Sequence, residues 1–130
     1  MGRSAVEKLP DTLLNKATLR GNEYAWKLDD IPTVIKTARS IGLINLGGQL
    51  QFRIPGATCE AYEIEVRPND KKCPENAAKQ CHEQFIELLR NKAVFIEKAK
   101  DWQSLRDYEA DGGDLLQAMC FVWYLATPGT

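Results

Sequence analysis

The segment Met119–Ala126 constrains the fold of this chain more than any other part of the sequence. Its residues are almost all apolar, and three of them are aromatic. Successive side chains of a strand point to opposite faces of a sheet, so a strand with this composition must be covered on both sides. The segment is also far shorter than the roughly 20 residues that a helix needs to cross a bilayer. We therefore predict a central strand here.

Two other segments have the period of an amphipathic helix. Over residues 31–41 apolar side chains recur at spacings of three and four, and Pro32 suits a first turn. Asp29 or Asp30 is expected to cap this helix, and Gly42 is expected to end it. A second helix is predicted over residues 75–90. Residues 92–99 either continue it or begin another piece, and a further short helix is expected around Trp102.

Alternating residues predict a short strand near Trp26 and a hairpin farther along the chain. Pro55 and Gly56 form the hairpin turn, between residues 49–54 and 58–66. A two-residue loop would place Phe52 opposite Cys59, whereas a three-residue loop places Leu50 opposite Tyr62. Burial of the apolar set favours the second register, because a one-residue slip turns every side chain to the other face. That register directs Glu60 toward the apolar side, and Gly47–Gly48 is expected to form a turn or bulge that starts the hairpin.

Together these elements predict an α+β fold in a two-layer sandwich. A mostly antiparallel sheet of three or four strands would carry helices packed on one face. The 130 residues are expected to form a single domain, in which residues 1–22 are an irregular N-terminal arm with one short helical turn.

Charge and cysteine content narrow the expected partners and compartment. The formal net charge of −1 creates no field that would attract nucleic acid or an anionic membrane, so neither is expected as a partner. The N-terminus lacks the apolar stretch of an export signal. We therefore expect a soluble, cytoplasmic protein whose four cysteines are reduced.

The residues that could carry chemistry do not form a recognisable motif. Cys59, Cys73, Cys81 and His82 lack the spacing of a zinc site, and Cys81 and His82 point in different directions on their helix. No triad signature surrounds the single histidine or a cysteine. Glu60 and the pair Asp29–Asp30 are the candidate acid–base groups, each with a simpler role as a paired or capping residue. We predict no catalytic residue, no metal and no cofactor.

The sequence therefore favours a non-catalytic domain that binds another protein through the polar face of its sheet. An immunity or antitoxin-type inhibitor of a bacterial toxin is the most concrete version of this hypothesis. The predicted contact residues are Gln49, Gln51, Arg53, Glu60, Tyr62, Glu63, Glu65 and Trp102.

Two alternatives stay open. One is a small-molecule-binding domain or a weakly marked enzyme, with a pocket between the hairpin, Trp26 and Trp102 and with Glu60 as the essential carboxylate. The other is a homo-oligomer that pairs through a sheet edge or through the polar face.

Overall fold

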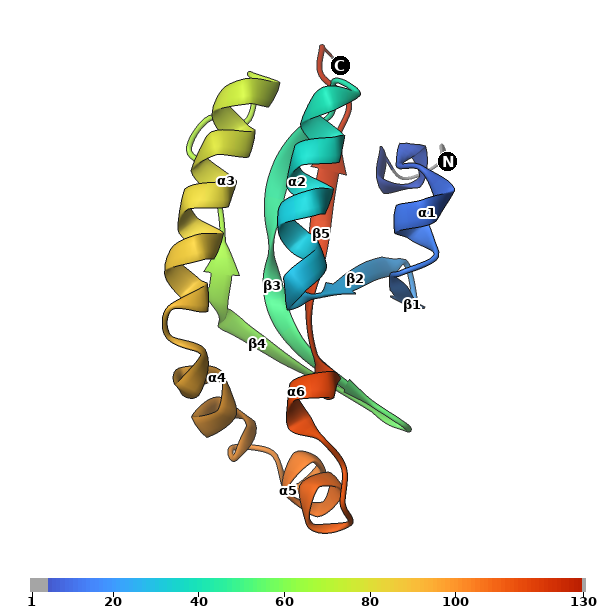
Figure 1. Cartoon of the computed structure of the whole chain (residues 1–130), viewed down its shortest axis with the longest axis vertical. Coiled ribbons are helices and arrows are strands. Elements are labelled where there is room, and N and C mark those ends of the chain that lie inside the picture. Colours follow the sequence, from blue (N-terminus) through green and yellow to red (C-terminus); the bar gives the residue numbers. More distant parts are fainter. Residues whose placement is uncertain (1–4, 130) are drawn as a thin grey trace.

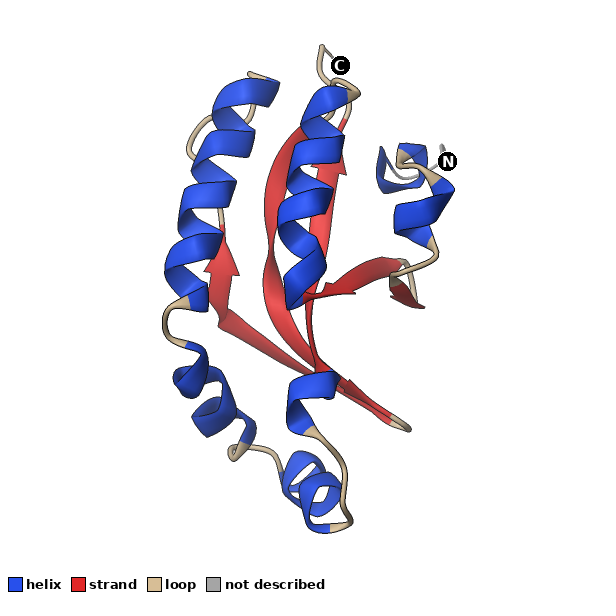
Figure 2. Ribbon diagram, viewed as in Figure 1, coloured by secondary structure: helices blue, strands red, loops and turns tan. Residues whose placement is uncertain are grey.

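An antiparallel sheet with helices on one face forms the framework of the molecule (Figures 1 and 2). The structure, a computed structural model, describes residues 5–129. Its strands are β1 (Thr18–Arg20), β2 (Glu23–Lys27), β3 (Ile44–Ile54), β4 (Ala57–Val66) and β5 (Met119–Ala126), and they lie side by side in the order β1-β2-β5-β3-β4. The predicted α+β class is confirmed, with five strands in the described residues instead of three or four. The additional edge strand β1 belongs to the segment that was expected to be irregular.

The helices lie on one side of this sheet. They are the 3₁₀ turns η1 (Ala5–Lys8) and η2 (Leu28–Asp30) and the helices α1 (Asp11–Leu14), α2 (Ile31–Ser40), α3 (Pro74–Leu89), α4 (Lys92–Ala99), α5 (Gln103–Ala110) and α6 (Leu115–Ala118). Residues 92–99 thus begin a separate helix. Helices α2 and α3 lie next to each other and run in opposite directions (Figure 1). No helix within residues 5–129 is both long and apolar enough to cross a membrane.

Strand β5 occupies the centre of the sheet, as its apolar composition predicts. Phe121 lies between Leu50 of β3 and Trp26 of β2, and all three side chains belong to the main core beneath the helices. On the other face, Val122 is also fully buried, although it belongs to a separate small cluster. Both faces of the strand are therefore covered, but by different kinds of residue.

Helix α2 forms where its period predicts, and its C-terminal end has the expected geometry. Gly42 adopts a φ of 83°, and the amides of Gly42 and Leu43 donate to the carbonyls of Arg39 and Ala38. This pair of bonds is a Schellman motif, and Leu43 is buried beside it. The expected cap at the other end is wrong. Asp30 makes no capping hydrogen bond with its side chain, because η2 leads directly into the helix.

The predicted hairpin register is wrong, because none of the observed β3–β4 pairs is a predicted one. Ile54 pairs with Ala57 across a two-residue loop, so Phe52 lies opposite Cys59. Leu50 then faces Ala61, but the next residue of β3, Gln49, faces Glu65. The intervening segment 62–64 has no partner on β3 and forms a bulge. Because the bulge contains an odd number of residues, it reverses the alternation and brings Ile64 and Val66 back to the core.

Gly47 and Gly48 lie inside β3, at a bulge against β5, where strands approach too closely for a side chain. A Cβ on Gly48 would lie 1.7 Å from the carbonyl oxygen of Val122, and one on Gly47 would lie 2.0 Å from that of Val66. The register shift between Asn45 and Gly47 marks the bulge. The predicted bulge is confirmed, but it lies inside β3 and not ahead of the first strand of the hairpin.

Candidate functional site

The sheet face opposite the helices carries a connected set of polar side chains, which we call the polar face. Its strand residues are Glu23 on β2, Gln49, Gln51 and Arg53 on β3, Thr58, Glu60 and Glu65 on β4, and Tyr124 on β5, as the pairing register requires. These side chains surround a small apolar cluster made by Ala25, Cys120 and Val122, against which Tyr124 packs.

Arg53 is the centre of the polar face. Its Nε donates to Gln51 Oε1 at 2.9 Å, its Nη1 donates to the carbonyl and hydroxyl oxygens of Thr18 at 2.7 and 2.8 Å, and its Nη2 donates to the Glu23 carbonyl at 3.1 Å. Burial lowers the pKa of Arg53, which nevertheless remains a cation because guanidinium is so weakly acidic. The side chain therefore connects β3 to β1 and β2 in a fixed orientation.

Gln51 is 0% exposed and lies beneath this arginine. While its amide oxygen accepts from Arg53, its amide nitrogen donates to Glu60 Oε1 at 3.0 Å and to Glu23 Oε1 at 3.5 Å. These contacts fix the orientation of the amide and also link the two carboxylates. A buried polar network of this kind is stable only when its members are satisfied. Within residues 5–129, every buried side-chain nitrogen and oxygen has a partner.

Tyr124 completes the network on β5 by donating its hydroxyl proton to Glu23. Burial, together with the hydrogen bond to Glu23 and its negative charge, raises the pKa of Tyr124 well above the ordinary value of a phenol. The phenol is therefore protonated at neutral pH and serves as a hydrogen-bond donor. It is not poised to act as a base.

Arg20 closes one end of the polar face. Its guanidinium donates to the carbonyls of Ala57 and Ile54 at 2.7 and 2.8 Å and to the Thr58 hydroxyl at 2.7 Å. Strands β1 and β4 are opposite edges of the sheet, so these bonds require the sheet to coil until its first strand meets the tip of the β3–β4 hairpin. The polar face is consequently the concave side of a strongly coiled sheet.

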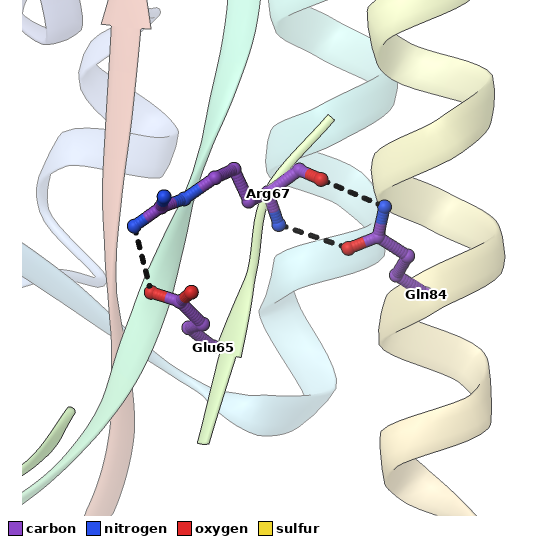
Figure 3. Close-up of polar contacts among 3 residues, drawn as sticks. All are labelled: Glu65, Arg67 and Gln84. Atoms are coloured by element: carbon purple, nitrogen blue, oxygen red, sulfur yellow. Dashed lines mark hydrogen bonds and ion pairs between the residues drawn. The ribbon is translucent and has the colours of Figure 1, made fainter. Parts of the chain in front are cut away.

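The far end of the polar face is fixed by a side chain from α3 (Figure 3). Gln84 accepts from the Arg67 amide at 2.9 Å and donates to the Arg67 carbonyl at 2.8 Å, as a neighbouring strand would. On the other side of the backbone, the guanidinium of Arg67 contacts Glu65 at 3.3 Å. This ion pair is exposed, and it extends the charged surface past the end of β4.

The predicted contact residues divide into two groups. Gln49, Gln51, Arg53, Glu60 and Glu65 all belong to the polar face. Glu60 was expected to face the core, and this is wrong: the corrected register places it on the polar face, half-buried against Gln51.

The other predicted residues lie away from this face. Tyr62 is 60% exposed at the bulge, and Glu63 forms an ion pair with Lys98 of α4. Lys98 also lies 5.7 Å from the ring centroid of Trp102, which packs on Phe52 on the helix-covered side. Trp26 belongs to that same side, so Glu60 does not share a pocket with the two tryptophans.

The sequence pattern did not predict Glu23, Arg20, Thr18 and Tyr124 as members of this site. The alternation around Trp26 places Glu23 on the opposite side of its strand from that tryptophan, which is a usable signal. Nothing local, however, indicates that this strand pairs with β5, and that pairing is what brings Glu23 to Tyr124.

The thiols have the character of packing groups. Burial raises the pKa of Cys81 to about 12 and that of Cys120 to about 11, which disfavours the thiolate that nucleophilic attack requires. Residues 5–129 contain no group of three or more His, Cys, Asp or Glu side chains placed to hold a metal ion. Cys81 is buried whereas His82 is exposed on α3, so the two do not converge.

Comparison of the chain with protein-family models, with curated proteins and with solved structures finds no match. Function is therefore inferred from the geometry alone.

Proposed function

We propose that the chain is a protein-binding domain that contacts its partner through the polar face. The observation that carries this proposal is the hydrogen-bonded arrangement of Arg53, Glu23 and Glu60 on a sheet surface that no helix within residues 5–129 covers. Their side chains are half-buried, so each is held in place while part of it is still accessible to a partner.

Preorganisation is what makes such a surface suitable for binding. A free arginine or glutamate that becomes fixed at an interface loses rotamer freedom, which costs about 0.5–1.5 kcal/mol for each side chain. Here the intramolecular bonds have already removed much of that freedom. Carboxylates and guanidinium groups also alternate across the face, and this pattern selects a partner with a complementary pattern over one with a uniform charge.

The rim adds groups that are more exposed and have fewer contacts: Glu65 pairs with Arg67, and Lys27 contacts Gln117. Glu65, Arg67 and Lys27 are exposed around the more buried centre. Protein interfaces commonly have this organisation, with a rim in contact with water around a better-packed middle. Within this class, inhibition of a bacterial toxin is the narrower role we propose. Two properties of the polar face support this role. Its positive and negative charges are balanced, and its side chains do not form a recognised catalytic arrangement.

The test compares two variants with the same change in charge. Gln49→Lys/Glu65→Lys alters the polar face, whereas Thr12→Lys/Glu83→Lys alters exposed residues of α1 and α3. A partner is first identified by cross-linking and mass spectrometry with the native chain, and its affinity is then measured by calorimetry. The polar-face variant should weaken binding at least about tenfold, which corresponds to about 1.4 kcal/mol, and the control should not.

Unchanged affinity for the polar-face variant, or an equal loss for both variants, would refute the proposal. A purified toxin domain encoded beside this chain tests the narrower role, since its activity should fall when the native chain is added. Light scattering at two concentrations shows whether the partner is a second copy of the chain.

A further inference from the structure

A second surface lies on the outer side of the helices, between α2 and α3. The two helices border an open groove of about 560 Å³, within the size range of sites for small ligands. Buried Ile35 and Ala78 form part of its floor, and half-buried Pro32 extends this apolar surface. The groove is lined by these two helices alone and is therefore separate from the polar face.

Basic side chains dominate the walls of the groove. Lys36 and Arg39 are four and seven residues after Pro32 on α2, while Lys79 and His82 are four and seven residues after Glu75 on α3. Residues with these spacings share one face of a helix. Because the helices run in opposite directions, Arg39 meets Glu75, at 3.9 Å, and Lys36 and Lys79 both belong to the middle of the groove.

The charges in the groove are not balanced internally. Glu75 is the single carboxylate among the lining residues and already contacts Arg39. Neither Lys36 nor Lys79 forms an ion pair or side-chain hydrogen bond with any residue in the range 5–129. Two lysines of like charge are thus left beside an apolar floor, where an anion would be favourable to both of them.

From this combination we infer that the groove binds a small amphipathic carboxylate, such as a medium-chain fatty acid in its monomeric form. Its apolar chain packs over Ile35 and Ala78, which are almost fully buried, and covers the part of half-buried Pro32 that is in contact with water. Its carboxylate, which is ionised at neutral pH, accepts hydrogen bonds from the Lys36 and Lys79 ammonium groups. The volume of the groove suits a ligand of this size better than it suits a whole partner helix.

The experiment is a calorimetric titration of the full chain with decanoate, kept below the concentration at which micelles form. 1-Decanol and decyltrimethylammonium have a chain of nearly the same length, with no charge and with a positive charge. Lys36→Gln/Lys79→Gln removes the two free cations, and Lys71→Gln/Lys92→Gln is the matched control with the same loss of charge at exposed sites outside the groove. Melting curves establish that all variants are folded.

The native chain and the control should bind decanoate with equal affinity. The affinity of the groove variant for decanoate should be at least about tenfold lower. 1-Decanol should bind more weakly than decanoate, and the ammonium compound should not bind. The inference is overturned if decanoate does not bind, if the groove variant binds it as tightly as the native chain, or if decanol matches it. Binding to phosphatidylglycerol vesicles without binding of monomeric decanoate overturns it too, because the surface would then recognise a membrane.

Discussion

The side chain of Asn45 joins three structural elements in the core. It is 0% exposed on β3, and its amide nitrogen donates to the Ile35 carbonyl of α2 at 3.2 Å. Its amide oxygen accepts from the indole nitrogen of Trp123 on β5 at 2.8 Å. One buried polar side chain thus sets the position of a helix relative to two central strands.

Replacing Asn45 with alanine should therefore destabilise the fold. The buried indole N–H of Trp123 would lose its acceptor, which costs about 1–3 kcal/mol before any cavity is counted. We expect the free energy of unfolding, measured with urea, to fall by about 2 kcal/mol or more. Asn69→Ala, at an exposed position, should change it by less than about 0.5 kcal/mol. Equal stabilities for the native chain and the Asn45 variant would show that the indole finds another partner.

Two glycines provide a separate test of the close approach between strands. Gly48→Ala places a Cβ against the backbone of β5, which cannot retreat without breaking the central ladder, so a loss of at least about 3 kcal/mol is expected. Gly42→Ala meets no atom within 4 Å and suffers only from its positive φ, at about 1–2 kcal/mol. Urea unfolding of both variants gives the comparison. A smaller loss for Gly48→Ala than for Gly42→Ala would contradict the packing seen at the bulge.

Among the structural elements, helices were easier to predict than strand pairing. The period of residues 31–41 and the glycine that follows are local signals, and α2 forms with the expected C-terminal end. The β3–β4 register depends on a bulge at residues 62–64 that no local signal marks. The sequence pattern over residues 50–66 suggested that every even-numbered side chain faces the core. On β4 this holds only beyond the bulge, where Ile64 and Val66 return to the core.

The loop before α3 contains a carboxylate that makes the stability of the fold depend on pH. The carboxylate of Asp70 accepts from the amides of Lys72 and Cys73 and from the side chain of Asn76, all at 2.8–3.0 Å. The hydrogen bond from Asn76, followed by those from the two amides, lowers the pKa of Asp70 from 3.8 to about 2. A carboxyl group whose pKa is lower in the folded than in the unfolded chain stabilises the folded state at any pH above its unfolded pKa. This stabilisation is lost as the pH falls toward the pKa of the folded state.

Stability should therefore decline between pH 3.8 and about 2, as Asp70 takes up a proton. In Asp70→Asn this part of the decline should disappear, and in Asn76→Ala it should shrink, because the contact that lowers the pKa of Asp70 most is removed. Melting temperatures measured across this range, with an NMR titration of the Asp70 carboxyl, check both expectations. A native slope retained in Asp70→Asn would refute the assignment.

On the scale of the whole molecule, the sheet separates two environments. Apolar side chains and helices cover one face, and hydrogen-bonded polar side chains cover the other. The sequence could predict the polar half of β3, because Gln49, Gln51 and Arg53 alternate with apolar residues. It could not predict that Thr18, Arg20 and Glu23 join them, since this follows from the coiling of the sheet and from the pairing of β2 with β5.

The two faces should open independently if Arg20 holds the polar face closed. Cys120 lies under the polar face and Cys81 lies under the helices, and burial raises the pKa of both thiols, to about 11 and about 12. At pH 8 neither thiol is reactive in the folded chain, so labelling of each reports how often its own face opens. Arg20→Ala removes the three bonds that Arg20 makes from β1 to the hairpin tip, and the bonds from Arg53 to Thr18 remain.

We expect alkylation of Cys120 in Arg20→Ala to accelerate by about tenfold, since the bonds are charge-assisted but only partly shielded from water, while alkylation of Cys81 changes little. Peptide mass spectrometry distinguishes the two sites. Arg90→Ala, which removes an exposed ion pair with Glu87, should affect neither rate. If alkylation of both thiols accelerated equally in Arg20→Ala, loss of the Arg20 side chain would destabilise the whole fold. The contacts of Arg20 would then not hold the polar face in particular. Selective exposure of Cys120 would instead show that the polar face is a layer with its own stability, to which the contacts of Arg20 at its edge contribute.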